Sequence, residues 1–75
     1  MNTGHFDLIN SALAAGRAAA KAQGIAVGGA IWGSHRCCKL ARTKDGSVEL
    51  MATPGGAWIL TRVGVGRIAD GQVVA

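Results

Sequence analysis

The spacing of apolar residues changes at Gly24, and this change limits the folds open to the chain. Before Gly24, apolar side chains recur every three or four residues from Phe6 to Ala20, which is the period of an amphipathic helix. After it, glycines separate short runs rich in Val, Ile, Leu, Thr and Trp, a pattern typical of antiparallel strands. A chain of 75 residues forms one domain at most. The sequence therefore predicts an α+β fold, with one N-terminal helix packed on a four- or five-stranded antiparallel sheet.

The helix is expected over about residues 4–23. Thr3 can cap its start, and Gly24 suits the left-handed residue that often follows the end of a helix. Arg17 and Lys21 are four residues apart and therefore share one side of the helix, where they form a small positive stripe. Alanine and glycine dominate the opposite, apolar side, so a sheet can approach it closely.

Several short strands are expected after the helix. Their bounds are about residues 25–32, 37–43, 47–53, 57–63 and 66–74. The first of these segments is apolar on both faces, as a central strand is, although Gly28 and Gly29 weaken it. The last segment contains a short hairpin around Asp70 and Gly71.

Two registers are open for the hairpin that joins the segments 37–43 and 47–53. A three-residue loop pairs Leu40 with Leu50, whereas a two-residue turn pairs Leu40 with Met51. The first register gathers the large apolar side chains of both strands on one face, and the second divides them between the two faces. We therefore expect the first register.

Positive charge is the strongest functional signal in the sequence. Eight Lys and Arg residues against four Asp and Glu residues give a net charge of +4. Four of the basic residues lie close together between positions 36 and 44. This cluster predicts an electropositive edge that binds a partner, but cations on an edge strand also protect a sheet from aggregation. The candidate binding residues are four in the second strand segment and its flanks, Arg36, Lys39, Arg42 and Lys44, and two on the helix, Arg17 and Lys21.

The adjacent cysteines, Cys37 and Cys38, cannot staple two segments of the chain together. Neighbouring side chains of a strand point to opposite faces, so the pair suits a tetrahedral zinc ion poorly even with His35 and His5 available, and we predict no metal site. In the preferred register Cys38 lies beneath the helix and Cys37 faces solvent. We expect Cys37 to form an intermolecular disulfide under oxidising conditions, giving a homodimer, while Cys38 stays reduced.

No set of residues has the spacing of a catalytic centre or of a cofactor site. Cys37 and His35 could act as nucleophile and base, but none of the four carboxylates is placed to orient the histidine. The glycine pairs match neither the dinucleotide-binding pattern nor the P-loop pattern. Trp32 and Trp58 are expected to be core side chains. We therefore predict a protein that is not an enzyme and uses no cofactor.

Three features predict a cytoplasmic protein that does not enter a membrane. Unpaired adjacent cysteines are typical of the reducing cytosol. The N-terminus lacks the pattern of a signal peptide. Arg17 and Lys21 interrupt the longest apolar region well before it could span a bilayer.

The segment 28–37, together with the turn at 44–46, resembles small inhibitors that phages and mobile elements make against bacterial defence, in particular anti-CRISPR proteins of the type I class. This resemblance implies a non-enzymatic inhibitor that binds a type I surveillance complex in the bacterial host cell and blocks access of target DNA. Many such inhibitors are acidic mimics of nucleic acid. This chain is basic, so mimicry of DNA is not expected.

Two other functions are compatible with the same residues. A small basic nucleic-acid-binding module would place the segment 36–44 on phosphates, and its affinity would fall steeply with added salt. A structural subunit of a phage particle would instead associate with copies of itself. Reversal of Arg36, Lys39 and Arg42 to glutamate is expected to abolish partner binding if the basic segment is the binding surface.

Overall fold

Helix α1, at Gly4–Ala22, is the first element of the computed structural model, which describes residues 4–74. Three backbone bonds close its end: the amide N–H groups of Gln23 and Ile25 donate to Ala20, and that of Gly24 donates to Lys21. Gly24 has a φ of 75°, which is the left-handed conformation that this type of helix end requires. The expected cap Thr3 lies outside the described residues.

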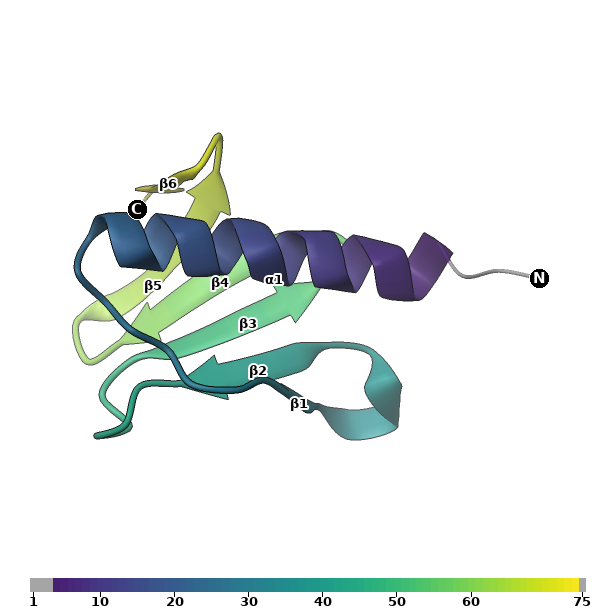
Figure 1. Ribbon diagram of the computed structural model, residues 1–75, viewed down its shortest axis with the longest axis horizontal. Helices are drawn as coiled ribbons and strands as arrows, with labels where there is room; N and C mark the ends of the chain where they lie inside the picture. Colours follow the sequence, from purple (N-terminus) through teal and green to yellow (C-terminus); the bar gives the residue numbers. More distant parts are fainter. Residues whose placement is uncertain (1–3, 75) are drawn as a thin grey trace.

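The sheet has six antiparallel strands that follow one another in chain order (Figure 1). The strands are β1 (Ile31–Trp32), β2 (Lys39–Arg42), β3 (Glu49–Thr53), β4 (Gly56–Thr61), β5 (Gly64–Ala69) and β6 (Gln72–Val74). The α+β class is therefore confirmed, but the sheet has six strands instead of four or five. The expected segment 66–74 accounts for the difference, because Asp70 and Gly71, both with positive φ, divide it into the hairpin of β5 and β6.

The first strand is much shorter than the sequence suggested. Only Ile31 and Trp32 pair with β2, at the edge of the sheet, and a single bridge joins Val27 to Thr43. The expectation of a central strand over 25–32 is therefore wrong. The exposed glycines Gly28 and Gly29 interrupt the segment, and glycine in a strand costs backbone entropy and provides no side chain to pack.

The register of β2 on β3 differs from the expected one. Leu40 pairs with Met51 and Ala41 pairs with Leu50, so the preferred pairing of Leu40 with Leu50 is wrong. The reason lies in the turn, which extends over residues 44–47 because the amide of Thr43 donates to the carbonyl of Val48. This longer loop shifts β2 by one residue and exchanges its two faces.

Asp45 holds this turn together. Its Oδ1 atom accepts hydrogen bonds from the Thr43 hydroxyl at 2.7 Å, from the Ser47 hydroxyl at 2.7 Å and from the Ser47 amide at 3.0 Å. The bonds from Ser47 and Thr43 lower the pKa of Asp45 from 3.8 to about 2, because they stabilise the charged carboxylate.

We predict that Asp45→Asn removes part of the acid sensitivity of the fold. A carboxyl group with a lowered pKa in the folded state stabilises it above the unfolded pKa, near 3.8, and this stabilisation is lost as the pH falls toward 2. Urea unfolding at several pH values between these limits should show a smaller loss for the variant than for the native chain. An equal loss in both proteins would contradict this role of Asp45.

The core lies between α1 and one face of the sheet. Most of its buried apolar residues are alanines, Ala19 and Ala20 of the helix with Ala41, Ala52 and Ala57 of the strands, and they surround the larger Ile9, Leu50 and Ile59. Leu50 lies against the backbone of Gly16, where an added Cβ would come within 2.6 Å of its Cδ1 atom. Neither tryptophan belongs to this core, contrary to expectation, because Trp32 is 39% exposed and Trp58 is half-buried on the other face.

Candidate functional site

The sheet face turned away from α1 carries a row of large side chains that crosses all six strands. Leu40, Met51 and Trp58 occupy directly opposed positions at its centre. The row continues through Ile31 on one side and through Arg67 and Val74 on the other. We call this surface the open face and define it by Leu40, Met51, Trp58, Leu60 and Val65 with Arg42, Arg62 and Arg67.

The open face is unusually apolar for a face that no other element within residues 4–74 covers. Antiparallel sheets with one solvated side normally place polar residues there. Here the central side chains are only half-buried by their neighbours, and Val65 is 60% exposed. Contiguous exposed apolar surface on a small protein commonly marks an interaction site.

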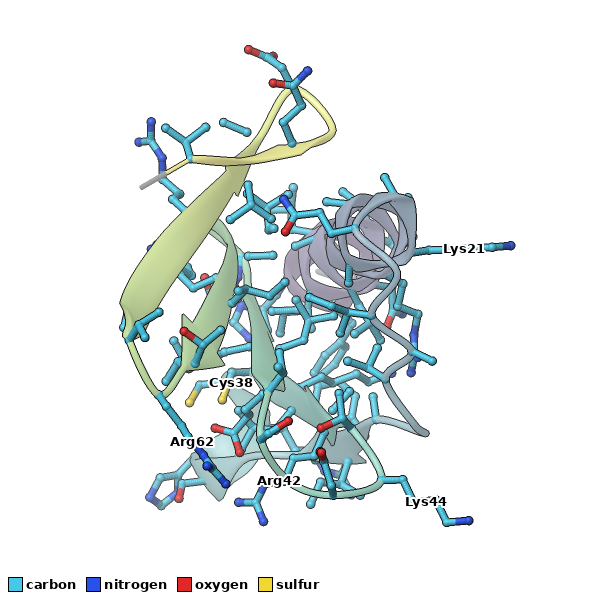
Figure 2. The ribbon with its side chains drawn as sticks, turned by 90° about the vertical axis from the view of Figure 1, so that its left-hand side faces the viewer. Lys21, Cys38, Arg42, Lys44 and Arg62 are labelled. Atoms are coloured by element: carbon cyan, nitrogen blue, oxygen red, sulfur yellow. The ribbon has the colours of Figure 1, made fainter. Side chains whose placement is uncertain are left out.

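Arginines surround this apolar surface. Arg42 on β2 lies opposite Glu49 on β3, and its Nε atom donates to Glu49 Oε2 at 2.5 Å. Arg67 on β5 lies opposite Trp58. Figure 2 shows Arg42 and Arg62 on the side of the sheet away from α1, whereas Lys21 points from the helix in the opposite direction.

The basic residues of the segment 36–44 do not form one surface. Arg36 belongs to the short helix η1 (Ser34–Arg36), which precedes β2. Lys39 points toward α1, where its Nζ atom donates to Asn10 Oδ1 at 2.9 Å and lies 4.6 Å from the centre of the Trp32 ring. Arg42 lies on the open face, and Lys44 extends from the turn on the other side of the molecule (Figure 2). The structure therefore separates the residues that the sequence grouped.

The two basic residues of the helix have a different setting. Arg17 and Lys21 line a pocket of about 440 Å³ with the loop that follows α1. The Nη1 atom of Arg17 donates to the carbonyl of Val27 at 3.3 Å, so this guanidinium holds the loop in place. Neither residue lies near the open face (Figure 2 for Lys21).

The cysteines do not occupy the expected positions. Cys38 is half-buried and lies on the same side of the sheet as Arg42, so its expected place beneath the helix is wrong (Figure 2). The shifted register is the cause. The pKa of the Cys38 thiol is raised, mainly by burial and to a smaller extent by a hydrogen bond with Cys37. Cys37 is exposed and its Sγ donates to the carbonyl of Ser34 at 2.9 Å; its intermolecular disulfide stays a prediction.

Sequence reasoning did not assign Trp58, Met51, Arg62 and Arg67 to a candidate binding site. The rejected register is a signal for part of this surface, because it places Leu40 beside Met51 and therefore turns Leu40 away from the helix. Within residues 4–74, no group of three or more His, Cys, Asp or Glu residues is arranged to hold a metal ion. No helix in the same range has the length and apolar character of a membrane span.

Comparisons of the chain with models of protein families, with curated proteins and with solved structures find no match.

Proposed function

We propose that the protein is a non-enzymatic inhibitor that binds another protein through the open face. The single observation behind this proposal is the row of Leu40, Met51 and Trp58, which is bordered by arginines and which no other element within residues 4–74 covers. Tryptophan, methionine and arginine are enriched in the centres of protein interfaces, and tryptophan and arginine are frequent among the residues that dominate binding energy.

The distribution of charge favours a protein partner over nucleic acid. A nucleic-acid backbone needs a continuous series of cations, because each phosphate contact adds to affinity. Lys39 is engaged with the helix and Lys44 points away from Arg42, so the segment 36–44 provides no such series (Figure 2). The small basic nucleic-acid-binding module remains the alternative function that the experiments below test.

The first partner to test is a type I CRISPR surveillance complex in the bacterial cytoplasm. The resemblance of the segment 28–37 to anti-CRISPR proteins of that class motivates this choice. In this proposal, the open face docks on a protein subunit of the complex and blocks access of target DNA. The mechanism needs no cofactor and no catalytic group.

Binding of target DNA by purified type I complexes, measured with and without the inhibitor, tests the proposal. We expect the native protein to inhibit at a stoichiometric ratio and Trp58→Ala to weaken inhibition by at least about tenfold, because a central tryptophan is a typical energetic anchor. Trp32→Ala is the matched control, since Trp32 lies on the helix side of the sheet against Phe6 and should retain inhibition.

Two outcomes would contradict the proposal. Equal inhibition by the native protein and by Trp58→Ala would reject the open face as the binding surface. Absence of inhibition, together with tight binding of the isolated protein to free DNA that weakens steeply with salt, would favour the nucleic-acid-binding module.

A further inference from the structure

A pocket of about 390 Å³ lies at one end of the open face, beside β2, β3 and β4. Arg42 and Arg62 line it together with Glu49, Leu60 and Thr61. Pairing across the strands brings these side chains together, because Arg42 lies opposite Glu49 and Glu49 lies opposite Leu60. Arg62 follows Leu60 by two residues, and Figure 2 shows it on the same side of the sheet as Arg42.

The two arginines differ in how they are held. Glu49 binds the Nε atom of Arg42 and is itself mostly covered, with 25% of its side chain exposed, so it fixes the direction of that guanidinium. The terminal nitrogens of Arg42 have no hydrogen-bond partner among residues 4–74, and 68% of its side chain is exposed. Within the same range, the side chain of Arg62 makes no hydrogen bond or ion pair. Both guanidinium groups therefore have free donors at the pocket.

We propose that Arg42 and Arg62 form a clamp for the carboxylate of an aspartate or glutamate side chain on the partner protein. This inference rests on the proposed function and specifies the chemistry of the partner surface. A guanidinium donates two parallel hydrogen bonds to a carboxylate, which gives both strength and orientation. Leu60 provides an apolar wall that continues into the open face, so the partner presents an acidic residue next to apolar ones.

The charge of the pocket suits one carboxylate better than a phosphate chain. The two arginines and Glu49 leave one positive charge, which a single carboxylate neutralises. Lys44, the nearest further cation along the chain, points to the other side of the molecule (Figure 2). A second phosphate of a nucleic acid would need a further cation, and the third arginine of the open face, Arg67, lies on β5 opposite Trp58, outside the lining of the pocket.

Binding of small probes to the isolated protein tests the clamp without knowledge of the partner. The probes are a capped oligoglutamate peptide, its oligoglutamine counterpart and an oligothymidine of equal charge, and the Nε–H signals of arginine in NMR spectra report the site. We expect oligoglutamate, and not oligoglutamine, to shift the signals of Arg42 and Arg62.

Three variants with equal loss of charge make the test specific. Arg62→Gln should weaken oligoglutamate binding about tenfold, because the charge-assisted hydrogen bonds from its guanidinium to the probe are lost while the ion pair of Arg42 with Glu49 stays intact. Arg42→Gln should weaken binding by at least as much. Lys44→Gln is the matched control and should change the affinity less than about twofold, since an exposed charge outside the pocket contributes little.

Equal weakening by all three variants would mean that oligoglutamate binds through non-specific attraction to positive charge, and this result would overturn the clamp. Tighter, strongly salt-dependent binding of oligothymidine at the same arginines would also overturn it and assign the pocket to phosphate. If oligoglutamate does not bind at Arg42 and Arg62 while inhibition still depends on Trp58, the clamp alone is rejected. If oligoglutamate binds at the two arginines but inhibition does not depend on Trp58, the proposed function is rejected instead.

Discussion

Leu50→Ala is expected to lower the free energy of unfolding by about 3 kcal/mol, because it removes most of the largest fully buried strand side chain and leaves a cavity. A domain of this length is stable by only roughly 4–11 kcal/mol, so the loss is a large fraction of the total. Urea unfolding followed by circular dichroism measures it. Leu50→Val, with an expected loss of about 1 kcal/mol, serves if the alanine variant does not fold.

Leu60→Ala is the matched control for this prediction. Leu60 lies on the open face and is half-buried, so truncation should cost about 1 kcal/mol or less. Equal losses for Leu50→Ala and Leu60→Ala would mean that the two faces of the sheet are equally well packed. That result would contradict the assignment of the core to the helix side.

Gly16→Val is expected to destabilise the protein by about 2 kcal/mol through overpacking. The new Cβ would lie 2.6 Å from Leu50 Cδ1 and 3.1 Å from Leu50 Cδ2, and Leu50 is completely buried. The better helix propensity of valine compared with glycine offsets only a few tenths of a kcal/mol. The same urea titration measures the loss.

The combination of Gly16→Val with Leu50→Ala distinguishes overpacking from a general loss of stability. Together the two changes conserve the number of carbon atoms at the contact between helix and strand. Valine at position 16 should therefore stabilise the Leu50→Ala protein although it destabilises the native one. Additive losses in the double variant would contradict a direct contact between Gly16 and Leu50.

The sequence predicted well those helices and hairpins that are determined by residues close together in the chain. The spacing from Phe6 to Ala20 and the glycine at position 24 are sufficient to indicate helix α1 and its end, because both act within one or two turns. The hairpin of β5 and β6 follows from Asp70 and Gly71 for the same reason. These signals were sufficient to predict the α+β class of the fold.

The part of the candidate site on β2 was harder to predict because it depends on one turn. The bonds that Asp45 accepts from Thr43 and Ser47 support a loop of four residues, and this loop determines which side of β2 faces the helix. The number of large apolar residues gathered on one face favours the opposite register. Two other expectations have a different cause. Trp58 is expected in the core because tryptophan is usually buried, and Lys39 is grouped with Arg42 because they are close in sequence, although these two lie on opposite sides of the sheet.

The agreement between chain order and sheet order has a consequence for how the protein forms. Each strand pairs with its neighbour in sequence, so no pairing waits for the closure of a long loop, and we expect rapid folding. The helix is an exception. Ile9 of α1 precedes all six strands in the chain, but α1 packs mainly on β3 and β4, the second of which ends at Thr61. During synthesis, the helix therefore remains without the strands on which it packs until the chain has been made as far as Thr61.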